Sequence, residues 1–434
     1  MNTFSRNGAL ISLTLLPFAA SANDGINTGD TAWILTATAL VLFMTLPGLA
    51  LFYGGLVRAK NVLSVLMQCF AITCIVSLLW VIGLYSLTFS EGGPFIGGLS
   101  KVFMAGITTE SQNGTVPEVV FSMFQLTFAV ITPALIVGGF AERMKFSAML
   151  IFSALWSVAV YAPVCHWVWA NDGWLFTRGL IDFAGGTVVH ITAGTAALVA
   201  AIVMGRRVGY GSQPMMPHNL TMTVTGAGML WVGWFGFNGG SALAANGHAG
   251  MAIMVTHVSA AAGAIAWSIM ELVQYKKASV LGMVTGMVAG LGTITPASGV
   301  VGPGGALLIG LIAGYVCFNA THILKRKLLI DDSLDVFPVH GVGGIIGTLM
   351  AGIFASGALG VFSGQGYAEG KDMLSQVGVQ ALGVVAVGAY TAVVTYLLLK
   401  LVQKLVGLRV AAEGEYAGLD TSEHNERGYD LGTL

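Results

Sequence analysis

Two histidines, His190 and His340, lie inside long, apolar, glycine-rich segments of the chain. An ionisable side chain at membrane depth is costly unless it has a partner or faces water, so this placement is typical of conduction or proton-handling sites. A simpler interpretation is that each ring only forms a hydrogen bond between packed helices. That interpretation suits either histidine alone better than it suits both, so the pair favours a functional site.

The composition identifies the class of protein that must hold these rings. Of the 434 residues, 55% are hydrophobic and only 9% are charged, and the mean hydropathy is +0.80. These values exclude a soluble domain and predict an all-α membrane protein with many spans. The 60 glycines indicate close packing of helices. The four cysteines lack metal-ligand or disulfide spacing, which indicates a packing role.

The first 22 residues are predicted to be a signal peptide. They contain a positive charge at Arg6, an apolar run over residues 9–16 and the small residues Ala20-Ser21-Ala22, which together are typical of an export signal. The apolar run is too short to span a membrane, which takes about 20 residues. The mature chain therefore begins near Asn23, on the non-cytoplasmic side.

Eleven further apolar segments form one predicted membrane domain over residues 23–406, followed by a polar tail over residues 407–434. The segments are 31–57, 62–89, 117–140, 146–170, 186–204, 219–241, 249–273, 279–297, 303–323, 336–355 and 375–403. Fifteen of the 19 Lys and Arg residues fall in alternate loops and in the tail; three lie in the other loops and one in the signal peptide. The positive-inside rule therefore predicts a cytoplasmic C-terminus.

Two short repeats divide the spans into halves. Phe52-Tyr53-Gly54-Gly55 ends the first span and Phe237-Asn238-Gly239-Gly240 ends the sixth, while Ile-Thr-Pro-Ala occurs at residues 131–134 and 294–297. Halves of five spans must cross the membrane in opposite directions, so we expect a 5+5 inverted repeat plus a final helix. The fifth and tenth spans then correspond, which brings His190 and His340 together near the midplane, where transporters of this construction bind their cargo.

An aspartate precedes each of these two spans, Asp182 before the fifth and Asp335 before the tenth. At about 1.5 Å per residue, His190 lies roughly 12 Å along a helix that begins at Asp182. His340 is closer to Asp335 in sequence, so it reaches the same depth only if the chain enters the membrane before it becomes helical. The sequence leaves that point open.

Four longer motifs identify a family. They are Asp182-Phe-Ala-Gly-Gly-Thr-Val-Val-His190-Ile-Thr-Ala-Gly, Ala141-Glu142-Arg143-Met-Lys-Phe-Ser, Trp234-Phe-Gly-Phe237-Asn-Gly-Gly-Ser241 and Val339-His340-Gly-Val-Gly-Gly. In type and order they resemble the Amt/Mep/Rh ammonium transporters, most closely the bacterial Amt channels. The resemblance extends from the signal peptide to the tail. It implies eleven-span protomers assembled as a homotrimer in a bacterial inner membrane, with one pore in each protomer and a periplasmic mature N-terminus.

The same resemblance implies residue roles. It implies an outer ammonium-binding site of Phe124, Phe128, Trp169 and Ser241; a gate of Phe128 and Phe237; paired pore histidines His190 and His340; Asp182, needed for conduction; and the pore-neighbouring residues Gln125, Tyr161 and Trp234. It implies a transporter, not an enzyme, without cofactor, metal or nucleic-acid partner. The tail, including Glu415-Tyr-Ala-Gly418-Leu419-Asp420, resembles the segment that packs under neighbouring protomers and helps a PII-type signalling protein to close the pores; a flexible terminus is the simpler alternative.

The chemistry of ammonium accounts for these residue types. Aromatic faces attract a small cation, and a hydroxyl such as that of Ser241 accepts one of its N–H bonds. Potassium has no such donors, so the site selects by ligand chemistry. Without the family resemblance, an interfacial aromatic belt would be the preferred interpretation of Trp169. The loss of its water shell makes an apolar pore too costly for a bare cation, whereas neutral ammonia can cross it. Linked imidazoles could pass the proton separately.

Three alternatives stay open at this stage. Asp182 suits a helix cap as well as a conduction role, since carboxylates accept the free N–H groups at helix starts. An intramembrane metalloenzyme could use His166, His190 and His340, although the required ligand spacing is missing. An ammonium sensor with low flux would use the same aromatic site as a transporter. The sequence does not reveal affinity, rate or whether net charge crosses with ammonia.

Overall fold

The computed structural model describes residues 25–360 and 364–429 of the chain. The predicted signal peptide, residues 1–22, lies outside the described residues. Within them, eleven helices are long and apolar enough to cross a membrane: Thr28–Leu56, Ala59–Phe89, Glu118–Phe140, Phe146–Trp169, Gly186–Met204, Leu220–Gly240, Gly247–Tyr275, Val280–Ala297, Pro303–Lys327, Phe337–Phe354 and Met373–Leu405. This confirms the predicted all-α fold of eleven spans.

Several spans are built from more than one helical piece. The pieces are α1 (Thr28–Phe43) and α2 (Ala50–Leu56); α3 (Val62–Leu79) and α4 (Tyr85–Phe89); α5 (Glu118–Phe140); α6 (Phe146–Trp156) and α7 (Ala162–Trp169); α8 (Thr192–Met204); α9 (Leu220–Gly240); α10 (Gly247–Tyr275); α11 (Val280–Ile294); α12 (Pro303–His322); α13 (Val342–Phe354); and α14 (Met373–Leu405). π-Helical turns join the pieces of the first, second and fourth spans. A widened turn bends a helix and re-aims its side chains, so these spans curve around the centre.

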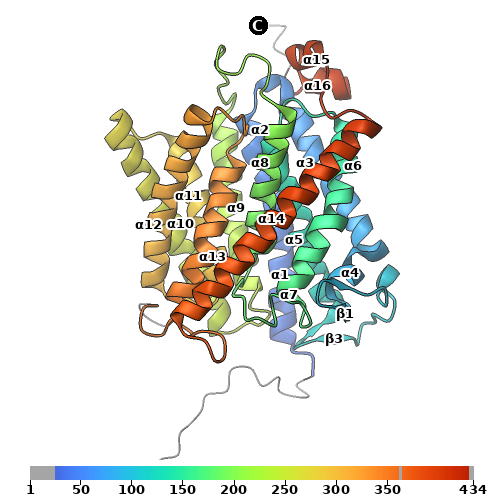
Figure 1. Ribbon diagram of the computed structural model, residues 1–434, viewed down its shortest axis with the longest axis vertical. Helices are drawn as coiled ribbons and strands as arrows, with labels where there is room; N and C mark the ends of the chain where they lie inside the picture. The colour runs from blue at the N-terminus through green and yellow to red at the C-terminus, as the bar shows by residue number, and fades with distance from the viewer. Residues whose placement is uncertain (1–24, 361–363, 430–434) are drawn as a thin grey trace, which may run out of the picture.

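The two ends of the bundle differ, and we name them by what they carry (Figure 1). The hairpin end holds β1 (Gly92–Gly93) paired with β2 (Ile96–Gly97), and β3 (Gln112–Asn113) paired with β4 (Val116–Pro117). The tail end holds the short helices α15 (Ala412–Ala417) and α16 (Leu419–His424). Helix α14 crosses the face of the bundle diagonally between the two ends.

The fifth and tenth spans share one local design. Each begins with a π-helical turn, Gly186–Ile191 or Phe337–Gly341, that contains a histidine. Each continues as a 13-residue α-helix, α8 or α13. The two Ile-Thr-Pro-Ala sequences differ in helix type, because residues 131–134 lie within α5 whereas Thr295–Ala297 forms a 3₁₀ turn after α11. Their threonines do correspond, since the Thr132 and Thr295 hydroxyls each donate to the carbonyl four residues earlier. The fifth and tenth spans therefore share their local shape, whereas the first and second spans are interrupted by π-helical turns and the sixth and seventh, α9 and α10, are continuous.

Glycines let neighbouring helices approach to backbone distance. A β-carbon at position 310 of α12 would lie 2.3 Å from the Ser259 carbonyl oxygen of α10, and one at position 139 of α5 would lie 2.8 Å from the Ala197 backbone of α8. Both distances are too short for any larger residue. In lipid, where van der Waals contact replaces the hydrophobic driving force, such close approach holds helices together.

A buried ion-pair network ties the loops at the tail end. Arg207 pairs with Asp331 at 2.8 Å and with Glu142 at 3.0 Å, and Glu142 also pairs with Arg58 at 2.8 Å. Burial alone would raise the pKa of Glu142, but the charges of Arg207 and Arg58 hold that pKa below its ordinary value. The network links loops from both halves of the chain, so it fixes the halves relative to each other at this end.

The tail packs against the membrane domain of its own chain. The Leu408 carbonyl accepts from the Lys145 N–H, and the Val410 N–H donates to the Arg143 carbonyl. Both Asp420 carboxylate oxygens accept backbone N–H groups at the start of α3, from Leu63 and Ser64. These bonds satisfy helix-end donors that have no partner within the helix.

We expect the Gly310→Ala substitution to destabilise the protein, because the added methyl group must displace the backbone around Ser259. The cost of such overpacking is about 1–3 kcal/mol. Thermal unfolding of purified protein in detergent measures it as a lower Tm. Gly388→Ala in α14 is the control, since a β-carbon there meets no atom within 4 Å; equal Tm values for the two variants would contradict the packing argument.

Candidate functional site

The two histidines meet at the centre of the bundle. Their Nδ1 atoms lie 3.2 Å apart, and their rings are stacked at 5.2 Å between centroids with 20° between planes. His190 is 1% exposed and His340 is 4% exposed. At this distance one Nδ1 donates and the other accepts, so the neutral pair shares a single hydrogen between them. Its two outer nitrogens are then unlike: one is an acceptor and the other is a donor.

The depth of His340 has a structural explanation. The segment before the tenth span enters the bundle before it becomes helical, since Asp331 and Asp332 are already buried. The aspartate that meets the start of this span is Asp332, whose Oδ2 accepts from the Phe337 N–H at 2.7 Å. Asp335 instead pairs with Lys325 at 2.8 Å. The expectation that the tenth span is entered through Asp335, as the fifth is through Asp182, is therefore wrong, and Asp332 is the counterpart of Asp182.

Asp182 caps the fifth span. Its Oδ1 accepts from the Gly185 and Gly186 N–H groups at 2.9 and 2.6 Å, and its Oδ2 accepts from the Thr187 N–H at 2.8 Å and from the Thr187 hydroxyl. Burial raises the pKa of Asp182, and the bonds from Thr187, Gly186 and Gly185 oppose that rise. The carboxylate thus has enough donors to carry a charge while it is shielded from water.

Apolar and aromatic side chains enclose the histidine pair. A narrow middle cavity of about 10 Å³ is lined by both histidines with Leu49, Phe52, Trp234, Phe237 and Val288, among others. The Trp234 ring stacks on His190 at 5.6 Å, and its Nε1–H donates to the Thr295 hydroxyl at 2.9 Å. Among the described residues, His190 Nε2 has no hydrogen-bond partner. That nitrogen is free to meet a solute.

A hollow of about 530 Å³ opens at the hairpin end. Gln125, Phe128, Trp169, Asp182 and Ser241 are among its lining residues. The Ser241 hydroxyl donates to the Phe237 carbonyl at 2.8 Å, so its lone pairs are left to accept a hydrogen bond. The Trp169 Nε1–H donates to the Asp182 carbonyl at 2.9 Å, which fixes the indole face. We call this space the hairpin-side hollow; it presents one hydroxyl acceptor among aromatic faces.

Two phenylalanine rings separate this hollow from the middle cavity. Phe128 lines the hairpin-side hollow and Phe237 lines the cavity, and their centroids are 4.4 Å apart with 40° between planes. Phe124 is fully buried behind Phe128, with its edge toward that ring at 5.0 Å, and does not line the hollow.

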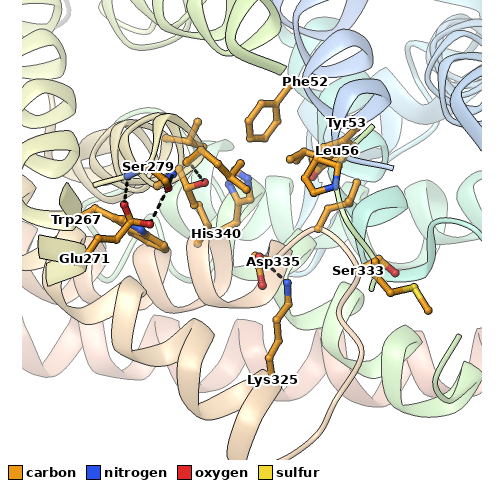
Figure 2. A pocket seen from close by; sticks show the side chains of 18 residues that line it. Phe52, Tyr53, Leu56, Trp267, Glu271, Ser279, Lys325, Ser333, Asp335 and His340 are labelled. Atoms are coloured by element: carbon orange, nitrogen blue, oxygen red, sulfur yellow. Dashed lines mark hydrogen bonds and ion pairs between the residues drawn. The ribbon is translucent and has the colours of Figure 1, made fainter. Parts of the chain in front are cut away.

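A second hollow of about 280 Å³ opens at the tail end (Figure 2). Its lining includes His340 with Phe52, Tyr53, Lys325 and Asp335, and Figure 2 shows the Lys325 ammonium bonded to the Asp335 carboxylate. We call this space the tail-side hollow. The histidine pair therefore lies between two hollows that face opposite ends of the bundle.

Two residues named from the sequence lie apart from this path. Tyr161 is fully buried and lines neither hollow nor the middle cavity. His166 faces the Thr88 and Gly93 carbonyl oxygens with its two ring nitrogens, at 2.8 and 2.7 Å, away from the histidine pair. Within residues 25–360 and 364–429, no group of three or more His, Cys, Asp or Glu side chains is arranged to hold a metal ion.

Sequence reasoning missed Asp332, although a signal for it exists. Eight residues separate Asp182 from His190, and the same spacing separates Asp332 from His340. The Thr295 hydroxyl, which orients Trp234, was also missed, and no local sequence signal reveals that bond.

Comparisons with known proteins agree with this arrangement. Residues 32–429 match the model of the Ammonium Transporter Family. The chain is 44% identical to an ammonium transporter of Aquifex aeolicus, over 95% of this chain and 96% of that protein, and 45% identical to one of Bacillus subtilis, over 92% and 98%. Two solved structures are also similar. The structure of a protein named Sensor Amt Protein has a TM-score of 0.85 and 32% sequence identity, over 91% of this chain and 98% of that one. The structure of Saccharomyces cerevisiae Mep2 has a TM-score of 0.83 and 36% identity, over 90% of this chain and 89% of that one.

Asp332 makes a prediction about pH and stability. Burial and the nearby charge of Asp335 raise the pKa of Asp332 from its ordinary value of 3.8 to about 7. A raised carboxyl pKa favours the folded state at low pH, and this contribution is lost as the pH rises through about 7. We expect the Tm of Asp332→Asn, relative to that of the unsubstituted protein, to increase by a few degrees between pH 5 and pH 7 and then to level off. The exposed change Glu110→Gln is the control; a Tm difference for Asp332→Asn that is independent of pH would contradict this account.

Proposed function

The chain belongs to the ammonium transporter family, and from this premise we propose that it takes up ammonium through the passage that holds His190 and His340. The relatives in Aquifex aeolicus and Bacillus subtilis are named as ammonium transporters. The observation that carries the proposal is the buried pair of imidazoles, 3.2 Å apart, between two hollows at opposite ends of the bundle. An apolar passage with this centre suits a small neutral molecule that can form hydrogen bonds.

Recruitment takes place in the hairpin-side hollow. The Ser241 hydroxyl accepts one N–H of the ammonium ion, and the faces of Trp169 and Phe128 attract its charge. Each aromatic face contributes about 0.5–2 kcal/mol, depending on how far water is removed. Phe124 supports Phe128 from behind, and Gln125 adds an amide to the wall. Potassium has no N–H group to donate to Ser241, so the hairpin-side hollow replaces the water shell of potassium less well than that of ammonium.

Ammonium gives up its proton as it leaves the hairpin-side hollow, and the acceptor is His190 Nε2 in the state of the pair in which that nitrogen carries no hydrogen. The middle cavity is too apolar and narrow to solvate a cation, because charge burial without a partner costs many kcal/mol. Ammonia carries no such cost, and its lone pair and N–H bonds match the acceptor and donor nitrogens of the pair. It passes when the rings of Phe128 and Phe237 part, and it regains a proton in the tail-side hollow.

The proton takes a separate path through the two imidazoles, which makes transport electrogenic. The rings share one hydrogen between their Nδ1 atoms, so a proton added at one outer nitrogen can leave from the other after the shared hydrogen moves. Asp182 stabilises positive charge near the start of this path, and Asp332 is its counterpart at the other end. Tyr161 lies outside the path and supports the fourth span.

The hairpin end faces the periplasm of a bacterial inner membrane and the tail faces the cytoplasm, as the distribution of Lys and Arg favours. Three protomers assemble as a homotrimer, each with its own passage. The docked tail and the tail-side hollow form the surface on which a cytoplasmic PII-type signalling protein acts. The mature chain begins near Asn23 after removal of the signal peptide.

A second candidate function is an ammonium sensor with low flux. One of the similar solved structures is named Sensor Amt Protein, and a sensor would bind ammonium with the same hairpin-side hollow. The two functions differ in flux through the passage. Current recorded from proteoliposomes that receive ammonium, methylammonium or potassium pulses separates them, since a sensor gives binding with little sustained current.

The variant with both His190→Ala and His340→Ala tests the proton path. We expect ammonium-evoked current in proteoliposomes to fall at least tenfold, because no imidazole remains to carry the proton. Ammonia uptake, followed as alkalinisation of the vesicle interior, should continue, because the substitutions widen the apolar passage. An ammonium-evoked current equal to that of the unsubstituted protein would contradict the proposed proton path.

Asp182→Asn separates the capping role from the role of charge. The asparagine keeps one oxygen that accepts N–H groups of the fifth span, so the Tm should fall only slightly. If the negative charge assists deprotonation, ammonium-evoked current should fall at least tenfold. Unchanged current in this variant would show that Asp182 serves only as a cap.

A further inference from the structure

Gly292, in the interior of α11, differs from the neighbouring buried glycines of the same helix. A β-carbon at position 286 would lie 2.4 Å from the Trp267 side chain, and one at position 290 would lie 2.3 Å from the Ser259 carbonyl oxygen. Those two glycines are required by helix packing. At position 292 a β-carbon would have only ordinary contacts, the nearest being His340 Nδ1 at 3.8 Å and His190 Cε1 and Nε2 at 3.9 Å. Packing therefore does not explain the glycine.

Gly292 lies beside the histidine pair, on the same face of α11 as a residue that lines the passage. Val288 lies one helical turn earlier on α11, and residues four apart share one face of a helix. Val288 lines both the middle cavity and the tail-side hollow. Gly292 continues this face toward the hairpin end and reaches the two imidazoles. The missing side chain thus leaves room at the point where a solute must pass both rings.

The chemistry at this point is that of a small amine. His190 Nε2 faces this room and has no hydrogen-bond partner among the described residues. One face of the His190 ring is covered by Trp234, which the Thr295 hydroxyl holds in place. A solute that bonds to Nε2 therefore has the Gly292 side of the passage in which to place the rest of its atoms.

We propose that Gly292 sets the size limit of the passage at the histidine pair, because its missing side chain leaves the room that a methyl group on the solute occupies. This inference rests on the proposed function and adds the residue that determines its substrate range. A methyl group at position 292 leaves both imidazoles in place, because 3.8–3.9 Å is a normal contact distance. It occupies the room that the methyl group of methylamine needs. Alanine also forms helices better than glycine, so the substitution suits α11.

The test compares ammonium with methylammonium on the same proteoliposomes. For Gly292→Ala we expect the ratio of methylammonium transport to ammonium transport to fall roughly tenfold, the lower range for one methylene group that an apolar pocket rejects. Gly54→Ala is the matched control, since a β-carbon there also has only ordinary contacts, of 3.5–3.7 Å, but meets Met222, Val62 and Leu66 instead of the histidines. Its ratio should not change. The Tm of each variant verifies that it is folded.

Val288→Ala enlarges the passage at the same face of α11, whereas Gly292→Ala narrows it. This test does not depend on whether the Gly292→Ala variant folds. Removal of two methyl groups beside the middle cavity should raise transport of ethylammonium relative to ammonium several-fold. An unchanged substrate ratio in Gly292→Ala, or an equal loss of both substrates, would overturn the size limit. If the unsubstituted protein transports neither ammonium nor methylammonium, the proposed function fails instead, so the two failures are distinguishable.

Discussion

The hydrogen bond between His190 and His340 is the interaction on which the rest of this structure depends. Each ring is buried among apolar side chains, so each needs the other as a partner. The bond forms only if the fifth and tenth spans bring their π-helical turns to the same depth from opposite directions. Asp182 and Asp332 fix those depths, because each meets the start of its span eight residues before the histidine. Aromatic rings and a missing side chain then shape the space around the pair.

Much of this arrangement could be predicted from the sequence. Hydropathy and charge located all eleven spans, because lipid imposes long apolar helices that local composition reveals. The four-residue repeats predict that His190 and His340 lie together, because they make the fifth and tenth spans correspond. Asp335 was assigned in place of Asp332 because both precede the tenth span, and only the path of the backbone decides which carboxylate reaches its first N–H groups. The space at Gly292 and the bond from Trp234 to Thr295 depend on contacts between distant segments, which no local pattern encodes.

The passage combines rigid and adaptable parts. Buried ion pairs among Arg58, Glu142, Arg207 and Asp331 fix the loops at the tail end, and glycine contacts fix neighbouring helices such as α10 and α12. By contrast, Phe128 and Phe237 meet only through van der Waals contact, and Ser241 keeps free lone pairs. Binding groups held by a stiff frame lose little entropy when a solute arrives, whereas the contact between two rings breaks at low cost. In the proposed function, selection and passage would therefore rest on different kinds of interaction.

The tail also has a consequence for the order in which the protein is made. The N–H groups that begin α3 are bonded by Asp420, a residue 356 positions later in the chain, and the first N–H of α6 is bonded by Glu423, 277 positions later. During synthesis both helix ends must be hydrated until the last segment leaves the ribosome, because their partners do not yet exist. These contacts at the starts of the second and fourth spans therefore form only after the tail has been made, and a chain that stopped before Asp420 would leave both helix ends open to water.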